Sequence, residues 1–176
     1  DLRGKSVLII GDGDLVVEKL KALVPTGCEI VVLSQNPSED LLAFKGDIKL
    51  IQKSFEECDL KCPYALVYGA TGDSVFNQEL EKLCAKQNLL FNAVDDPSHC
   101  HFLSSAIFRR GALTLAVSTS GASPNLAKLI LRKLEGAIGK EYELLVAWLL
   151  KARPIVATRI RAAKKRKVFW DHFFQV

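Results

Sequence analysis

Short apolar runs alternate with helix-like segments along the first hundred residues of the chain. Residues 5–10 (KSVLII) form a β-branched run without polar alternation, a pattern typical of a strand covered on both faces in a parallel sheet. Residues 15–23 then carry apolar side chains at helical spacing, until Pro25 and Gly27 end the helix. The alternation continues with strands at 29–33, 48–51, 64–68 and 89–94 and helices at 37–44 and 73–85. This order predicts an α/β fold, with an open parallel sheet wound by right-handed crossovers.

The pattern changes after Pro97. Residues 102–108 and 112–118 are two extended stretches joined by Arg109-Arg110-Gly111, which indicates a hairpin. From Ser123-Pro124 onward, an N-cap followed by a first-turn proline, the pattern is helical. We expect helices at 123–138, 140–151 and 154–168. The predicted domain boundary lies near residue 110, between a parallel α/β domain (1–110) and a smaller strand-plus-helix domain (111–176).

The composition favours a soluble, cytoplasmic protein. The chain has 176 residues, enough to bury a core, and its apolar runs are all interrupted by charges before the ~18 residues that a membrane span needs. The first residues run into a strand rather than a signal-peptide core. Five cysteines at irregular spacings fit a reducing compartment better than a disulfide framework. Cys58 and Cys62 lack the second pair of a zinc site, so we expect small buried thiols and no bound metal.

Positive charge is concentrated in the last 26 residues. The net charge is +4, but residues 1–150 sum to −3 and residues 151–176 to +7. Such a basic tail is usually a solvated helix face, and it can also attract an anionic ligand. Nucleic-acid binding through residues 164–167 is the weaker alternative, because only Phe169 and Trp170 accompany them as an aromatic platform. We therefore expect neither a nucleic-acid nor a membrane partner.

The turn Gly11-Asp12-Gly13 follows a buried strand and resembles the start of a dinucleotide-binding loop. Gly11 permits the tight turn, and Gly13 lets a pyrophosphate approach the N–H groups at the start of the next helix. The third glycine of the full pattern is replaced by Val16, and Asp12 and Asp14 bring negative charge toward the expected phosphate position. A turn that binds no nucleotide is therefore the alternative interpretation.

A second loop of small residues favours nucleotide binding. Ala70-Thr71-Gly72 follows the fourth strand and should lie on the same carboxyl edge of the sheet as the first turn. The second strand ends in Ser34-Gln35-Asn36, where an acid that binds the ribose would be expected. No arginine is present to favour a 2′-phosphate, so we expect NAD, with Ser34 or Asn36 on the ribose. The predicted cofactor-binding residues are Gly11, Gly13, Asp14, Leu15, Ser34 and Thr71.

The fifth strand leads into two carboxylates and a His-Cys-His triplet. Asp95 follows this strand at the edge where ligands of open α/β sheets bind, and Asp96 should point elsewhere in extended chain. The simpler interpretation is a turn, for which Asp and Pro are common residues. His99-Cys100-His101 offers a metal-ligating or proton-accepting group, but the side chains of adjacent residues diverge and rarely hold one ion. A surface or packing role is the alternative.

A hydroxyl-rich loop precedes the first helix of the second domain. Such a loop at a helix start can receive an anion, and the same N–H groups can simply be capped. We predict that it contacts the substrate. Its residues are Ser118, Thr119, Ser120 and Gly121.

Several stretches together resemble precorrin-2 dehydrogenase, the N-terminal module of siroheme synthase. They are LRGKSVLIIGDGDLVVEKLKALVPTGCEIVVL, ATGDSVFN and NAVDDPSHCHFLSSAIFRRGALTLAVSTSGASPNLAKLILRKLE. The resemblance implies a Rossmann-like NAD-binding domain at 1–110, a dimerisation and helical substrate domain at 111–176, and a homodimer. It implies oxidation of precorrin-2 to sirohydrochlorin with NAD, and in some members insertion of Fe²⁺. Asp95 matches the family's functional aspartate and is the candidate catalytic base. The implied substrate carries eight carboxylates, which suits the basic tail.

A non-catalytic alternative remains. A Rossmann-like module could sense NAD and transmit the redox state through its helical appendage without turning over a substrate. This alternative also requires nucleotide binding, but it does not require Asp95. The two hypotheses therefore differ at that residue.

Overall fold

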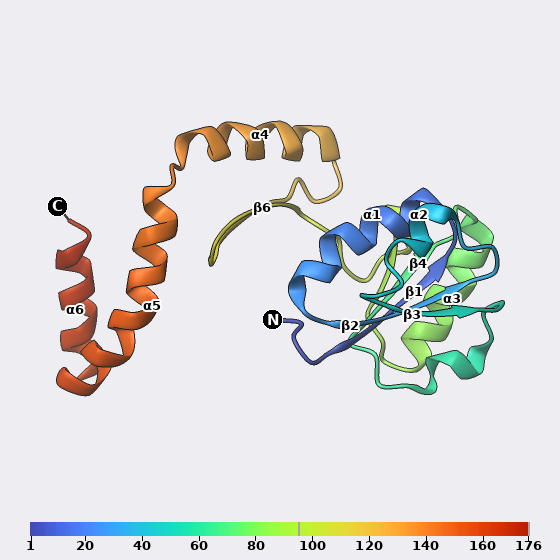
Figure 1. Ribbon diagram of the computed structural model, residues 1–176, viewed down its shortest axis with the longest axis horizontal. Coiled ribbons are helices and arrows are strands. Elements are labelled where there is room, and N and C mark those ends of the chain that lie inside the picture. The colour runs from blue at the N-terminus through green and yellow to red at the C-terminus, as the bar shows by residue number, and fades with distance from the viewer. Residues whose placement is uncertain (95, 176) are drawn as a thin grey trace. The chain divides into compact units, whose positions relative to one another are not determined.

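A five-stranded parallel sheet forms the core of the first part of the chain (Figure 1). The computed structural model describes residues 1–94 and 96–175 and divides the chain into two units, Asp1–Leu103 and Ser104–Val176. The sheet has the strand order β3-β2-β1-β4-β5, with every neighbouring pair parallel. The strands are β1 (Ser6–Gly11), β2 (Glu29–Ser34), β3 (Lys49–Gln52), β4 (Leu66–Ala70) and β5 (Phe91–Ala93). The chain therefore switches direction across the sheet between β1 and β4.

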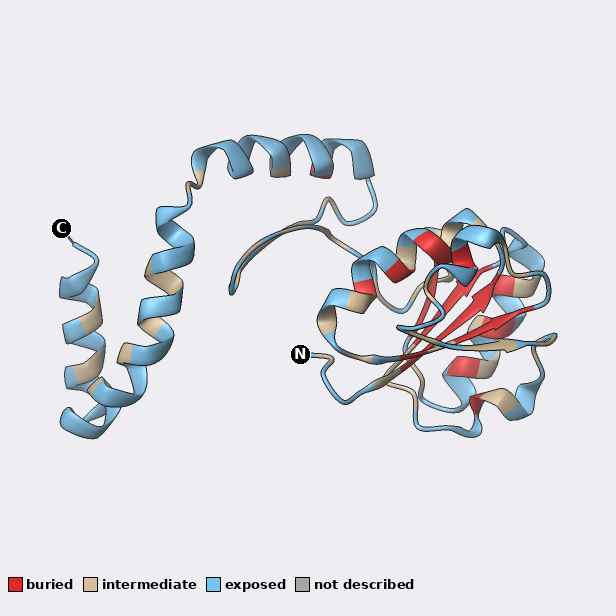
Figure 2. Ribbon diagram, in the orientation of Figure 1, coloured by how far each residue is buried: buried red, intermediate tan, exposed pale blue. Residues whose placement is uncertain are grey.

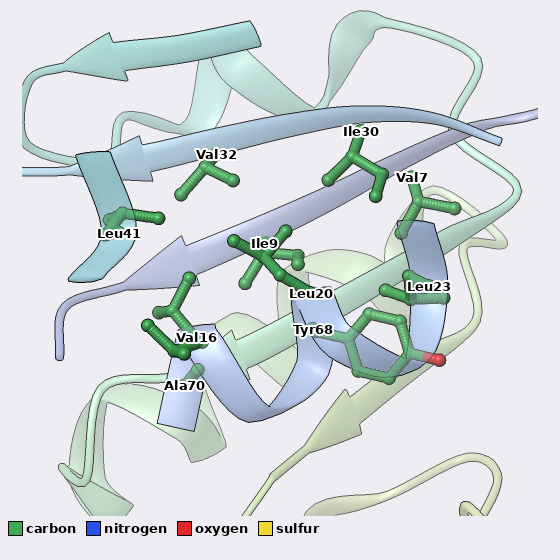
Figure 3. Close-up of a cluster of buried hydrophobic side chains, with 11 residues drawn as sticks. Val7, Ile9, Val16, Leu20, Leu23, Ile30, Val32, Leu41, Tyr68 and Ala70 are labelled. Carbon is green, nitrogen blue, oxygen red and sulfur yellow. The ribbon is translucent and has the colours of Figure 1, made fainter. Parts of the chain in front are cut away.

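Alternating side chains of β1 pack against helices on both faces of this sheet. Figure 2 shows the burial concentrated in the strands and the inner helix faces. Val7 and Ile9 join the cluster drawn in Figure 3, which includes Leu20 of α1 (Asp14–Leu23). Leu8 joins a second cluster with Leu80 of α3 (Ser74–Lys86). Burial on both faces explains the unbroken apolar run of this strand. The short elements are α2 (Glu39–Leu42), η1 (Val24–Thr26), η2 (Glu57–Lys61) and η3 (Pro97–His99).

The second unit consists of a hairpin followed by three helices. The antiparallel strands β6 (Ala106–Arg110) and β7 (Leu113–Val117) turn at Gly111, which has φ +55°. The guanidinium of Arg110 donates to the carbonyl oxygen of Ile138 and links the hairpin to the end of the first helix. Among the described residues of this unit, only Ala127 is buried. The helices are α4 (Pro124–Ala137), α5 (Glu141–Arg159) and α6 (Ala163–Phe173).

The expected helix break near Pro154 is wrong. Helix α5 runs through this proline, and the break comes instead at residues 160–162. A proline inside a helix removes one backbone hydrogen bond without necessarily ending the helix. At the observed break, the guanidinium of Arg166 donates to the carbonyl oxygens of Ile160 (2.9 Å) and Arg161 (2.6 Å). This long-side-chain cap could not be recognised from local hydrophobic spacing.

The sheet follows the sequence expectation closely, with small shifts at its edges. The fourth strand begins at Leu66, two residues later than expected, and the fifth is confined to residues 91–93. The boundary between the two units lies after Leu103, so both hairpin strands belong to the second unit. The sequence-based boundary at residue 110 falls instead at the end of β6.

Candidate functional site

A cleft of about 320 Å³ lies at the carboxyl edge of the sheet, where the strand order reverses between β1 and β4. Crevices at such reversals are where open α/β sheets bind their ligands. The walls come from the ends of β1 and β2, the segments after β3 and β4, and the first turns of α3. The lining residues are Ile10, Gly11, Asp12, Leu33, Gln35, Lys53, Ser54, Phe55, Thr71, Asp73 and Phe76.

The two glycines of the first turn have the geometry of a dinucleotide cradle. Gly11 has φ +145°, and a Cβ on it would clash with the carbonyl oxygen of Ala70 in β4. Gly13 has φ +71° and precedes α1, and a Cβ on it would meet no atom within 4 Å. No side chain caps this helix start, so the N–H groups of its first turn, which includes Asp14 and Leu15, retain unmet hydrogen-bonding capacity. The residues therefore fit a pyrophosphate approaching the helix over Gly13.

Asp12 turns toward the end of β2. Its Oδ1 accepts hydrogen bonds from the Ser34 hydroxyl and from the backbone N–H of Asn36 (3.0 Å). The expectation that Asp12 brings its charge toward the phosphate position is therefore corrected. Ser34 is 1% exposed, and its hydroxyl is committed to Asp12. Asp12 lines the cleft, whereas the buried hydroxyl of Ser34 contacts the Asp12 carboxylate.

Thr71 is held by a buried amide that the sequence analysis did not single out. Its hydroxyl donates to Oδ1 of Asn77 (3.3 Å) and accepts from the N–H of Asp73 (3.2 Å). Asp73 in turn caps α3 through the N–H groups of Val75 (2.9 Å) and Phe76 (3.1 Å). Asn77 is fully buried. Asn77 lies three and seven residues before Leu80 and Cys84, on the buried face of α3. A polar residue at this helical spacing is the sequence signal that could have identified Asn77.

Lys53 is the cation that lines the cleft, and acidic partners hold it. Its ammonium lies 3.1 Å from Oδ1 of Asp59 and 3.6 Å from Oε2 of Glu56. The hydrogen bond to Asp59 raises the pKa of Lys53 above its ordinary value. Nearby, the amide of Gln35 donates to the Ser54 hydroxyl (2.8 Å) and joins the segments after β2 and β3. The charge of Lys53 is therefore balanced by neighbouring carboxylates.

Asp95, the predicted catalytic residue, lies outside the described residues. Its neighbour Asp96 accepts hydrogen bonds from the hydroxyls of Ser98 and Ser74, the latter at 2.8 Å, and lies 2.7 Å from Nδ1 of His99. Hydrogen bonds from Ser98, His99 and Ser74 hold the pKa of Asp96 well below its ordinary value. Asp96 therefore connects the start of α3 to η3 as an ionised carboxylate.

The His-Cys-His triplet points in three directions. His99 contacts Asp96, whereas Nε2 of His101 lies 3.0 Å from Oε1 of Glu81. The thiol of Cys100 donates to the carbonyl oxygen of Ala93 (3.2 Å), and burial raises its pKa. Over residues 1–94 and 96–175, no three His, Cys, Asp or Glu side chains gather as ion ligands. The triplet does not form one coordination site.

The predicted substrate loop lies in the second unit and is closed by its own hydroxyls. The Thr119 hydroxyl donates to the carbonyl oxygen of Ser123 (3.0 Å) and accepts from its N–H (3.1 Å). Ser118 accepts from the N–H of Ser120, which has φ +52°, and Gly121 follows with φ +84°. The Ser123 hydroxyl caps α4 through the N–H of Leu126 (3.2 Å). Thr119 and Ser123 thus shape the loop, whereas Gly11, Gly13, Ser34 and Thr71 meet at one sheet edge in the first unit.

Comparison with known proteins covers both units. Residues 1–106 match the family described as "Putative NAD(P)-binding", and residues 110–137 match the central domain of sirohaem biosynthesis proteins. SirC, a precorrin-2 dehydrogenase of known structure, is 30% identical to this chain, which covers 82% of it. The chain belongs to the precorrin-2 dehydrogenase family of siroheme biosynthesis. The resemblance and the Rossmann-like fold class inferred from the sequence are therefore confirmed, and the first unit is an NAD(P)-binding domain.

Two relatives and one solved structure illustrate this membership. The siroheme synthase of Nitrosococcus oceani is 35% identical over 99% of this chain and 38% of its own length. That of Zymomonas mobilis is 32% identical over 99% of this chain and 37% of its own length. The chain therefore spans less than two fifths of these relatives. The structure of SirC superposes with a TM-score of 0.71 and covers 95% of this chain.

Within the part of the chain that the structure describes, no helix combines the length and the apolarity needed to cross a bilayer.

Proposed function

We propose that the chain oxidises precorrin-2 to sirohydrochlorin with NAD, as a step of siroheme biosynthesis. The observation that carries this proposal is the open cradle over Gly13 at the start of α1, on the carboxyl edge of the sheet, in a chain of this family. The likeness to SirC, which extends over both units, supports the same reaction.

The predicted cofactor, catalytic and substrate residues have different roles in this proposal. Gly13 lets the pyrophosphate approach the N–H groups at the start of α1, including those of Asp14 and Leu15. Gly11 allows β1 to pack closely against β4 next to this site. Thr71, oriented by Asn77, borders the nicotinamide end of the same cleft. The bound nicotinamide supplies the hydride acceptor. Asp95 accepts the proton that the substrate releases, and the loop of Ser118, Thr119, Ser120 and Gly121 receives substrate carboxylates.

NAD rather than NADP is the cofactor that we propose. A 2′-phosphate needs an unpaired cation, and residues 34–36 at the end of β2 contain no arginine or lysine. Lys53 lines the cleft, but Asp59 and Glu56 already balance its charge. This end of the cleft suits an uncharged ribose.

The direct test is conversion of precorrin-2 by the purified chain. With NAD present, we expect the absorption spectrum of sirohydrochlorin to appear together with NADH absorbance. A chain that binds NAD tightly but forms neither product would instead support the non-catalytic sensor. A chain that binds neither NAD nor NADP would contradict both functions.

We also propose that the protein is a homodimer built through the second unit. Apolar side chains of this unit remain open to solvent, including Leu144 (73% exposed), Leu150 (61%) and Ile107 (46%). The two-stranded hairpin also leaves both outer edges without a strand partner in the described chain. Unpaired strand edges and apolar surface are commonly covered by a partner chain. A second copy would supply such a cover.

The cysteines support a cytoplasmic location. All five are free of disulfide bonds, and Cys58 and Cys62 are exposed rather than buried as expected, because they lie at the ends of a short surface 3₁₀ turn. Free exposed thiols persist in reducing compartments. We therefore propose that the protein works in the cytoplasm.

A further inference from the structure

The carboxylate of Asp12 occupies a position that another residue usually fills in dinucleotide-binding folds. In those folds an acid near the end of the second strand binds the adenosine ribose. Here β2 ends at Ser34, and residues 34–36 contain no acid. Asp12 comes from the turn after β1, yet it accepts hydrogen bonds from Ser34 and from the N–H of Asn36. A carboxylate therefore stands at the end of β2 although this strand does not supply it.

The two carboxylate oxygens of Asp12 are not equivalent. Both hydrogen bonds end on Oδ1, whereas Oδ2 has no hydrogen-bond partner among the described residues. Asp12 is exposed and lines the cleft. One oxygen thus anchors the side chain to the end of β2, and the other remains able to accept hydrogen bonds from a ligand.

We propose that Asp12 is the ribose-binding carboxylate of this chain and that it selects NAD over NADP. This inference rests on the proposed cofactor site. A ribose 2′-hydroxyl can donate a charge-assisted hydrogen bond to Oδ2. A 2′-phosphate at the same place has no such proton to donate, and its negative charge is repelled by the carboxylate.

Lys53 is the positively charged residue of this cleft that could attract the 2′-phosphate of NADP. It lines the same cleft, but its ammonium contacts Asp59 and Glu56, and the hydrogen bond to Asp59 keeps it protonated within that group. Together with Asp12, these groups comprise three carboxylates and one ammonium. The local balance is therefore negative, which disfavours a phosphate.

The test compares NAD and NADP affinities by calorimetry in the wild-type chain and in Asp12→Asn. The wild type should prefer NAD. Asp12→Asn keeps an oxygen for Ser34 and Asn36 but removes the charge, so the preference for NAD should shrink roughly tenfold or more, as expected for a hydrogen bond to a charged group. Asp47→Asn is the matched control, because Asp47 is exposed and precedes β3, at the opposite edge of the parallel sheet. Its preference should equal that of the wild type.

Two further variants separate recognition from structure. Ser34→Ala removes one anchor of Asp12 but keeps its charge, so it should retain the preference for NAD. Asp12→Glu also keeps the charge and should still discriminate against NADP, and this variant decides the matter if Asp12→Asn fails to fold. In turnover assays, Asp12→Asn should raise KM for NAD and leave kcat near the wild-type value.

The possible failures are distinguishable. Equal loss of NAD and NADP affinity in Asp12→Asn would overturn the role in selection, as would a wild-type chain that binds NADP as tightly as NAD. A Glu variant without any preference would overturn it too. A wild-type chain that binds neither nucleotide would overturn the proposed cofactor site itself, and this inference with it.

Discussion

Gly11 and Gly13 are two residues apart, but different parts of the structure constrain them. At Gly11 the constraint is the neighbouring strand, because a Cβ would clash with the carbonyl oxygen of Ala70. At Gly13 the protein leaves open space, and the backbone conformation (φ +71°, ψ −152°) is one that other residues rarely adopt. The first glycine therefore serves packing of the sheet, and the second leaves room for a ligand.

Substitution of Gly13 should separate binding from folding. We expect Gly13→Ala to lose about 1–3 kcal/mol of stability from backbone strain, and to lose most of its affinity for NAD because the methyl group enters the cradle. Gly11→Ala should be less stable still, since overpacking against β4 adds roughly another 1–3 kcal/mol. Denaturant unfolding and calorimetry measure the two effects. Unchanged NAD affinity in folded Gly13→Ala would contradict the placement of the cofactor.

Asp95 is the residue whose substitution distinguishes the enzyme hypothesis from the NAD-sensor hypothesis. If its carboxylate accepts the substrate proton, Asp95→Asn should lower turnover of precorrin-2 by roughly 10²- to 10⁴-fold, as is typical for loss of a general base. NAD affinity should stay near the wild-type value.

The control for this experiment follows from the structure. Asp96 is unsuitable, because its carboxylate is bonded to Ser74, Ser98 and His99 and its loss would disturb η3. Asp47→Asn removes the same charge from an exposed position before β3. If Asp95→Asn and Asp47→Asn convert precorrin-2 at the same rate, Asp95 is a turn residue and the proposed base is wrong.

At the scale of elements, α5 and α6 are held together by aromatic contacts and by Arg166. The rings of Trp148 and Phe173 stack with centroids 5.4 Å apart, and Trp170 meets Phe173 edge to face. Arg166 donates to two carbonyl groups at the end of α5, so this basic residue supports the helix turn. Not every positive charge of the tail is therefore available to a substrate.

Pro154 is a local weakness of α5. It is exposed within the helix, and its missing N–H leaves the carbonyl group one turn earlier without its helical partner. Pro154→Ala should restore this bond and stabilise the helix by up to about 3 kcal/mol. Circular dichroism should show a higher melting temperature and no loss of helix. A lower melting temperature would mean that the structure depends on the proline.

At the scale of the whole molecule, the two units differ in how they bury apolar surface. The first unit has two core clusters, one on each face of its sheet, and the second buries only Ala127 among its described residues. A unit with so little core of its own gains stability from a partner surface. The contrast in burial is visible in Figure 2.

The proposed dimer predicts the behaviour of one surface substitution. Analytical ultracentrifugation should show a dimer of the wild-type chain at micromolar concentration. Ile107→Glu, in the hairpin, should weaken the dimer at least tenfold, because it introduces a charge into buried apolar surface. Leu42→Glu in α2 is the control, since Leu42 is similarly exposed (42%) but belongs to the first unit. A monomeric wild type that turns over precorrin-2 would contradict the proposal.

Local pattern was sufficient for the elements and for much of the family assignment. Strands β1, β2, β4 and β5 were predictable because each is a short, largely buried run, and the glycine turn because a tight βα turn needs these residues. The family was recognisable from the stretch at 92–135, whose residue order is specific. The ends of some elements, such as the start of β4 and the end of α5, could not be predicted, because they depend on contacts that local hydrophobic spacing does not reveal.

The polar contacts of the site were decided by the tertiary structure. Asp12 meets Ser34 across 22 residues of sequence, and Ser74 meets Asp96 across the same separation. From the sequence we expected the charge of Asp12 to lie near the cofactor phosphates. The sequence does not show in which direction the side chain of a turn residue points. Parallel strands bring their carboxyl ends to one edge, so the partner of a side chain there is set by strand order rather than by proximity in sequence. For this reason the sequence was sufficient to predict the family and the position of the cleft. Only the tertiary structure showed that the Asp12 carboxylate lies at the end of β2.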